Sequence, residues 1–381
     1  MVKNAEQSNK TFKILSFFAI YFVVSGHLSF GGIPMFYEWF TVYSFHIPLL
    51  CFISGYFFKD KYTDAPIRYI LKKFKRHIIP LYIWNLIYGL LTAFLRNYHI
   101  NYGEALNIHS LLIAPLTDGH QFKLYLAAWF VFPLFCVEVF NVLFRWFLKK
   151  IKLHNEWMIS VVYMGIGILA TSITTGENTG WSLAALRSMF MLAFFGFGTL
   201  YNRKLEKIDT MSNIWYFAIV FGIQFIVTCF DHHSLIYLVS WMREFNGGPV
   251  VPFITGITGI LFWLRISKIL TPALGNSRAV NYVADHTADI MRHHFLGFFV
   301  FNTIVFIIWK NFFRNAFEFN YVAYYTDADY NMKLSNIPYI SVIYVLFGFA
   351  VSLGIGWLCD KMKNYISGKI TGSGKTQSTE S

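Results

Sequence analysis

The chain has 381 residues, of which 56% are hydrophobic and 20% aromatic, whereas only 14% are Asp, Glu, Lys or Arg. An average soluble domain is about one quarter charged, so this composition argues against a protein that folds in water. The formal net charge of +12 does not indicate a nucleic-acid partner, because the lysines and arginines stand at the ends of apolar runs and form no solvated basic face.

Apolar runs long enough to cross about 30 Å of hydrocarbon as helices recur along the chain. We expect membrane spans at 12–30, 35–58, 77–96, 125–148, 157–175, 181–201, 213–231, 249–266, 290–309 and 337–359. The first run resembles a secretory signal, but it is too long and lacks a small-residue cleavage site, so we expect it to be retained. The predicted fold class is all-α, a polytopic membrane bundle of about ten transmembrane helices. Residues 1–366 are expected to form this integral membrane domain, and residues 367–381 a disordered cytoplasmic tail.

The basic residues are distributed unevenly among the segments between these spans. If the N-terminus lies inside, most of the 32 lysines and arginines fall in cytoplasmic segments. The positive-inside rule therefore predicts that the N- and C-termini are both cytoplasmic. We expect a multi-pass protein of the cell (plasma) membrane. The longer segments on the other side, 97–124, 232–248 and 310–336, are rich in Tyr, His, Asn and Asp, and we expect them to cover an external acceptor site.

Ionisable side chains at membrane depth are costly and usually face a protein interior or a water-filled cavity, which makes them candidates for function. His27, in the sequence Val-Val-Ser-Gly-His, lies about 21 Å above the cytoplasmic start of the first span, beyond the midplane. Two interpretations stay open for His27: a hydrogen bond to a neighbouring helix, or a catalytic role. The small residues Ser25 and Gly26 favour the close approach of another helix or of a substrate.

The second span carries His46 and Pro48 at mid-depth, with Ser54 and Tyr56 nearer its cytoplasmic end. Pro48 withholds a backbone donor, so a carbonyl must be satisfied locally. Such irregular backbone is tolerated where it is buried in protein or lines a cavity. A simple proline kink explains the segment equally well.

A basic helical face follows the second span. Lys72, Lys73 and Arg76 share this face because they are spaced by three and four residues. Attraction to anionic lipid headgroups would explain three cations here. The functional interpretation is a cradle for the phosphates of a cytoplasmic donor.

Two further charged residues, Glu138 in the fourth span and Arg187 in the sixth, each need a compensating partner inside the membrane. We expect them to face one cavity and to pair with each other. The group His286, Asp289, Arg292, His293 and His294 near the ninth span lacks the spacing of a known metal motif, so no metal is expected. The four cysteines lie far apart in apolar runs and predict neither disulfides nor a thiolate metal site.

Six short motifs stand in a fixed order along the chain: Val23-Val24-x-Gly26-His27, Phe45-His46-Ile-Pro48-Leu-x-x-Phe52-Ile-Ser54-Gly55-Tyr56, Lys73-x-x-Arg76-x-x-x-Pro80, Trp129-Phe130 before Glu138, Arg187 before Phe194-Phe195-Gly196-Phe197-Gly198, and Leu274-Gly275-Asn276-Ser277 ahead of His294. In this order and spacing the chain resembles acyltransferase family 3, the membrane O-acyltransferases that modify bacterial surface glycans. The resemblance covers nearly the whole chain.

The resemblance implies transfer of an acetyl or other short acyl group from cytoplasmic acetyl-CoA to a hydroxyl of a cell-surface glycan, an exopolysaccharide or a lipid-linked sugar. It implies that His27 acts as a general base or accepts the acyl group itself. The implied catalytic residues are His27, Glu138 and Arg187, and the implied donor-binding residues are Lys72, Lys73, Arg76, Ser54, Tyr56 and His46. The expected partners are the glycan or lipid-linked sugar, membrane lipids and other polysaccharide-biosynthesis proteins, with no metal and no nucleic acid.

Broken spans and buried charges also mark transport pathways, so a transporter or flippase for a polysaccharide or lipid-linked oligosaccharide is the main alternative. A non-catalytic subunit of a glycan-export complex is a third possibility. Both would leave acetyl-CoA intact, whereas an acyltransferase would release free CoA.

Overall fold

The computed structural model describes residues 2–28, 41–230, 235–314, 318–330 and 340–373. Residues 29–40, which include the end of the first expected span, the link at 31–34 and the start of the second span, therefore lie outside the described residues, as do parts of the expected loop at 310–336. Within the described part, the chain consists of helices and loops, with isolated β-bridges between Gly103 and Phe122 and between Leu238 and Arg243.

The helices follow one another along the chain in this order: α1 (Val2–Gly26), α2 (Val42–Tyr56), η1 (Asp60–Asp64), α3 (Pro66–Arg96), η2 (His109–Ile113), η3 (Lys123–Phe130), α4 (Val131–Lys150), α5 (Glu156–Ile173), α6 (Gly180–Leu200), η4 (Tyr201–Leu205), α7 (Asn213–Phe230), α8 (Val251–Leu274), α9 (Arg278–Asp285), α10 (Thr287–Ile308), η5 (Trp309–Phe313), α11 (Tyr321–Thr326) and α12 (Ile340–Ser373).

Eight helical segments among the described residues are long and apolar enough to cross a membrane. They are Pro66–Arg96, Lys123–Lys150, Glu156–Ile173, Gly180–Leu205, Asn213–Phe230, Val251–Leu274, Thr287–Phe313 and Ile340–Tyr365. These segments coincide with the last eight of the ten expected spans, which confirms an all-α, polytopic membrane bundle. The first two expected spans correspond to α1 and α2, and α2 has only 15 described helical residues.

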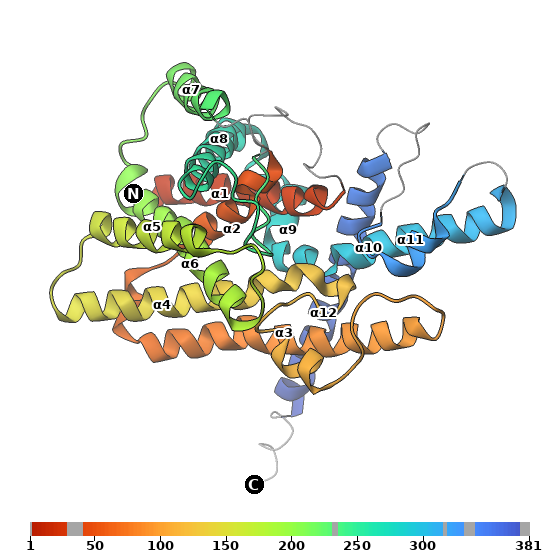
Figure 1. Ribbon diagram of the computed structural model, residues 1–381. Coiled ribbons are helices and arrows are strands. Elements are labelled where there is room, and N and C mark those ends of the chain that lie inside the picture. Colours follow the sequence, from red (N-terminus) through yellow and green to blue (C-terminus); the bar gives the residue numbers. More distant parts are fainter. Residues whose placement is uncertain (1, 29–40, 231–234, 315–317, 331–339, 374–381) are drawn as a thin grey trace, which may run out of the picture.

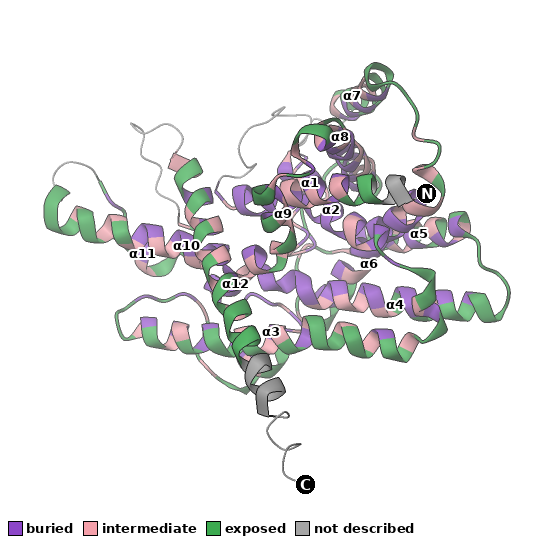
Figure 2. Ribbon diagram, turned by 180° about the vertical axis from the view of Figure 1, so that it is seen from behind, coloured by how far each residue is buried: buried purple, intermediate pink, exposed green. Residues whose placement is uncertain are grey.

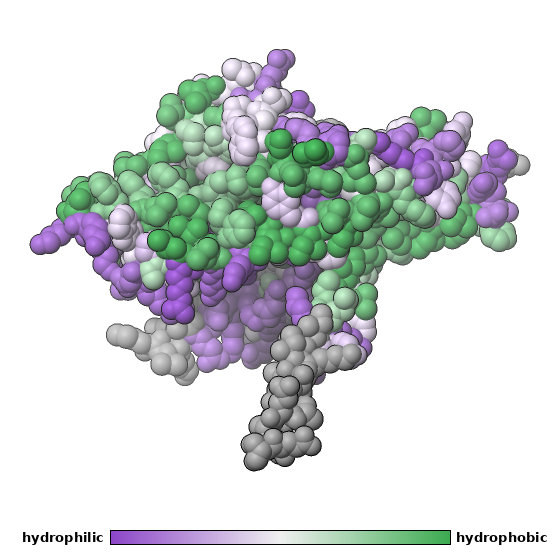
Figure 3. Space-filling view, turned by 90° about the horizontal axis from the view of Figure 1, so that it is seen from below, coloured by the Kyte–Doolittle hydropathy of each residue, from purple (hydrophilic) through white to green (hydrophobic). Residues whose placement is uncertain are grey.

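Most of the long helices lie side by side, as α3, α4 and α5 show in Figure 1, whereas α12 runs steeply across their direction. The segment containing α6 is central, because 78% of its most apolar stretch of 18 residues is buried, against 22% for α7. Figure 2 shows the same contrast, with exposed residues along α3 and α7 and buried residues along α4 and α6. Seen from below, a band of hydrophobic residues crosses the molecule between hydrophilic regions, as a membrane protein requires (Figure 3).

Glycines allow two pairs of helices to pack backbone against backbone. A side chain at Gly55 of α2 would collide with the carbonyl of Phe195 on α6, and a side chain at Gly198 would collide with the carbonyl of Phe52. Gly297 of α10 also lies close to the backbone of α12 at Gly348. Small residues permit such contacts, and they therefore hold the centre of the bundle together by close van der Waals packing.

The helix α12 continues to Ser373 and so passes the boundary at residue 367, where the sequence predicts a disordered tail. Its last part, Asp360–Ser373, is rich in lysine and glycine, but it follows an apolar helix without a proline to end it. The remainder of the expected tail, residues 374–381, lies outside the described residues.

Candidate functional site

Three helices meet where α1 ends. His27 follows directly after Gly26, the last residue of α1, and its ring lies 5.3 Å from the ring of His294 on α10, at an interplanar angle of 28°. Gly348 of α12 completes the contact, because a Cβ atom there would lie only 3.4 Å from the Cβ of His294. We call His27, His294 and Gly348 the histidine junction.

The side chain of His294 is fully buried. Its Nδ1 lies 3.0 Å from the carbonyl oxygen of Ile290, and because a carbonyl can only accept, Nδ1 carries the proton. The other nitrogen, Nε2, is then a lone-pair acceptor, and it has no hydrogen-bond partner among the described residues. The backbone of α10 therefore fixes one neutral tautomer of His294.

The neighbouring His293 points toward a different helix. Its Nδ1 lies 2.8 Å from the hydroxyl of Tyr88 on α3, and its ring makes an edge contact with Trp84, with 4.3 Å between ring centroids. His286 instead contacts Asp289, with 3.0 Å between Nδ1 and Oδ2. Asp289 also accepts a hydrogen bond from Arg292 over 3.1 Å. The residues that the sequence groups near the ninth span thus divide into this charged cluster, His293 and His294, because successive positions on a helix face different neighbours.

His46 lies beside the junction. It is buried in α2, where its Nδ1 donates to the carbonyl of Val42 over 2.8 Å, and its ring lies 5.1 Å from that of Tyr43. The Tyr43 hydroxyl donates to the carbonyl oxygen of Gly26 over 3.2 Å, which ties the first turn of α2 to the end of α1. His46 is therefore held close to the residue that precedes His27.

Glu138 is almost fully buried on α4, with 3% of its side chain exposed, and both of its partners come from α3. Lys73 forms an ion pair with one carboxylate oxygen, and the Nε2 of His77 lies 3.1 Å from the other. The prediction that Glu138 pairs with Arg187 is therefore wrong. Lys73 and His77 are one helical turn apart, and the packing of α3 on α4 brings both side chains to the same carboxylate.

Arg187 lies at a different place and bonds to backbone oxygens. Its guanidinium donates to the carbonyls of Thr117 and Asp118, each over 3.0 Å, and to that of Ser240, and it lies 4.9 Å from the centre of the Trp129 ring. These bonds fasten the loops at 97–124 and 232–248 to α6. Arg187 thus organises loop backbone, and its charge is solvated by peptide dipoles and an aromatic face.

The predicted donor-binding residues are spread along α2 and α3. Lys72 and Arg76 are exposed, whereas Lys73 is engaged by Glu138. The Tyr56 hydroxyl donates to the Glu206 carboxylate over 2.9 Å. Ser54, two residues before the end of α2, donates to the carbonyl of Leu50 over 3.0 Å.

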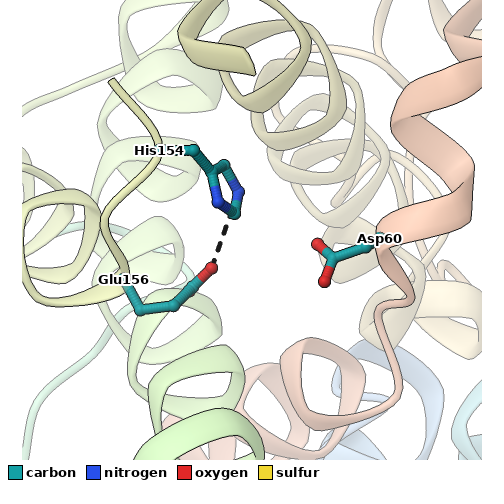
Figure 4. Close-up of side chains that lie close together, drawn as sticks. All are labelled: Asp60, His154 and Glu156. Atoms are coloured by element: carbon teal, nitrogen blue, oxygen red, sulfur yellow. Dashed lines mark ion pairs between the residues drawn. The ribbon is translucent and has the colours of Figure 1, made fainter. Parts of the chain in front are cut away.

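One further group has the composition of a metal site. Ligand atoms of Asp60, His154 and Glu156 lie within 4.8 Å of one another (Figure 4). Two guanidinium groups already hold the carboxylates, however. Arg145 donates to both oxygens of Glu156 over 2.7 and 3.0 Å, and Arg203 pairs with Glu156 and, over 2.7 Å, with Asp60. The arrangement is an ion-pair network that joins α4, α5 and the α2–α3 connection, and its cations fill the place that a metal ion would take.

Reasoning from the sequence did not predict that His294 contacts His27, because His294 stood within a group considered for metal binding. The one available signal was the motif Leu274-Gly275-Asn276-Ser277 ahead of it. Its position opposite His27 depends on the crossing of α1, α10 and α12, which no local pattern records.

The fold defines a multi-pass membrane protein with buried histidines between its helices. The family model of the acyltransferase domain of acyltransferase family 3 matches residues 11–361, so the chain belongs to this family and is a membrane acyltransferase. Comparison with curated proteins and with solved structures gives no match.

Proposed function

We propose that the protein is an O-acyltransferase of the cell membrane, which transfers an acetyl or other short acyl group from cytoplasmic acyl-CoA to a hydroxyl of a surface glycan or exopolysaccharide. Family membership supports acyl transfer, and the histidine junction is the observation that carries the proposal. Two imidazoles in contact inside a membrane bundle supply a base where the surrounding residues are mostly apolar.

His27 acts in this proposal as the general base. A neutral imidazole nitrogen takes the proton of the acceptor hydroxyl while the oxygen attacks the thioester carbonyl. The new C–O bond forms, the C–S bond breaks, and the leaving CoA thiolate takes the proton that His27 holds, which returns His27 to its neutral form. The products are the acylated glycan and free CoA.

The donor enters from the side that the positive-inside rule predicts to be cytoplasmic. The exposed cations Lys72 and Arg76 bind the nucleotide phosphates, and Lys73, held by Glu138, fixes the position of this basic face. The pantetheine arm then passes along α2, beside Tyr56, Ser54 and His46. Arg187 contributes indirectly, because it holds the loops through which the acceptor would approach.

The test uses the full-length protein purified in detergent with radiolabelled acetyl-CoA, and the acceptor is envelope glycan isolated from cells that lack the protein. The wild type should release free CoA and label the glycan, and His27→Ala should lower transfer by about 10²–10⁴-fold, as expected for removal of a general base. His109→Ala is the matched control, because His109 is exposed at the start of η2.

Full transfer by His27→Ala would disprove the catalytic assignment. Intact acetyl-CoA and unlabelled glycan with the wild type would contradict the proposed function and favour a transporter or a non-catalytic subunit.

A further inference from the structure

His294 has a buried ring nitrogen, Nε2, without a hydrogen-bond partner among the described residues. Buried polar groups in folded proteins nearly always have hydrogen-bond partners, so an exception calls for an explanation. The imidazole of His294 is 0% exposed, and among the described residues its Nε2 has no partner. Its Nδ1 is occupied by the carbonyl of Ile290, so Nε2 can only accept a hydrogen bond.

Among the described residues, no side chain or backbone group donates a hydrogen bond to this nitrogen. The rings of Phe295 and Phe298 lie 4.5 and 5.6 Å from that of His294 and carry only carbon. On the α12 side, the nearest backbone belongs to Gly348, which has no side chain to offer. A ligand that carries an O–H or N–H group is therefore the partner that would satisfy Nε2.

The position of His294 indicates which ligand this is. Its ring lies against the ring of His27, at which the proposed reaction deprotonates a hydroxyl. A sugar acceptor presents several hydroxyls on one ring, so a second hydroxyl can reach the neighbouring imidazole.

We propose that His294 binds the acceptor: its Nε2 accepts a hydrogen bond from a second hydroxyl of the sugar whose reacting hydroxyl faces His27. The site thereby selects acceptors that carry at least two neighbouring hydroxyl groups. This inference rests on the proposed function, and it makes His294 a binding residue whose loss affects KM more than kcat.

Two substitutions separate binding from packing and from base catalysis. His294→Phe retains a flat ring of similar size and removes the acceptor atom. His294→Gln retains an acceptor oxygen but cannot hold a proton. His109→Phe, at an exposed histidine, is the control for the same chemical change.

The measurements use acetyl-CoA with envelope glycan from cells that lack the protein, and acetyl-CoA in water without glycan. For His294→Phe we expect the glycan KM to rise about fivefold, as for the loss of one hydrogen bond, with kcat and the water-driven release of CoA within about twofold of the wild type. His294→Gln should keep the KM within about twofold.

An unchanged KM in His294→Phe would overturn the inference. A fall of kcat in His294→Gln as large as that in His27→Ala would also overturn it, because His294 would then be a base. These results are distinguishable from failure of the proposed function, in which the wild type itself releases no CoA and labels no glycan.

Discussion

The histidine junction and the network around Arg145 each contain a fully buried side chain, but among the described residues only Arg145 has a hydrogen-bond partner for each of its side-chain nitrogens, whereas His294 does not. Arg145 is 0% exposed, yet its guanidinium donates to Asn141, to both oxygens of Glu156 and to Thr199. His294 is equally buried, and its Nε2 has no partner among the described residues. The two regions therefore satisfy their polar atoms in different ways.

This difference separates residues that hold the fold from residues that meet a ligand. A buried charge with a full set of partners stabilises one arrangement of helices, and its loss leaves the other charges unpaired. A buried acceptor without a partner weakens the folded state slightly, and a ligand that donates a hydrogen bond removes that cost. The contrast gives predictions in which stability and activity respond separately.

The largest effect on stability is expected from Arg145→Met. Removal of the guanidinium leaves the Glu156 carboxylate with fewer partners in a buried position, so the free energy of unfolding should fall by about 3 kcal/mol. Thermal unfolding in detergent measures this change. CoA release per folded molecule, measured at low temperature, should stay near the wild-type value.

Lys149→Met is the matched control for this prediction. Lys149 lies near the same end of α4 as Arg145 and also forms an ion pair, with Asp64 of η1, but both of these side chains are exposed. Its cost should not exceed about 1 kcal/mol. Equal losses in the two variants would mean that burial does not distinguish the network.

Gly297→Ala should affect the junction more than the fold. The added methyl carbon would lie 2.5 Å from the carbonyl oxygen of Phe347 and 2.6 Å from the Cα of Gly348, so α10 and α12 must separate. Because His294 lies one turn away on α10, transfer should fall by roughly tenfold to a hundredfold. The free energy of unfolding should fall by only about 1–3 kcal/mol, which is the usual cost of one extra methyl group in a packed contact. The melting temperature in detergent measures this change.

Gly354→Ala provides the comparison for Gly297→Ala, because nothing lies within 4 Å of a Cβ at Gly354 of α12. This variant should retain transfer and stability, since alanine is the better helix former. If both alanines leave transfer intact, close contact of α10 with α12 is not needed at the junction.

The smallest effect concerns His120, a buried loop residue whose ring stacks 4.0 Å from that of Trp241. Burial, followed by the charges of Arg187 and Lys123, lowers the pKa of His120 to about 2. The unfolded chain therefore binds a proton below pH of about 6.5 that the folded loop excludes, and stability falls as the pH drops further.

His120→Phe should remove this contribution. Melting temperatures in detergent at pH 7.5 and pH 5 should differ less for the variant than for the wild type, with a penalty of up to about 1.4 kcal/mol per pH unit in the wild type. A parallel pH dependence in both proteins would show that His120 is already accessible to protons in the folded state.

The sequence predicted the helices well because a membrane span needs about 20 apolar residues in succession, which is a local property. The segments from Pro66–Arg96 to Ile340–Tyr365 fall where hydropathy places them. The motif around His27 also indicated the family that the match over residues 11–361 establishes.

Partners of buried groups were harder to predict. The sequence required a partner for Glu138 and for Arg187, because neither charge is stable alone inside a membrane. It did not identify Lys73 and His77, or the carbonyls of Thr117 and Ser240, because those partners depend on which helices pack together.

The sequence by itself thus determined the apolar helices and the family, because these follow from composition and short motifs. Only the tertiary structure decided that His294 lies against His27 and that Glu138 of α4 takes its partners from α3. The physical reason is that contacts between residues hundreds of positions apart arise from helix crossings, and glycines such as Gly297 and Gly348 set how close those crossings are.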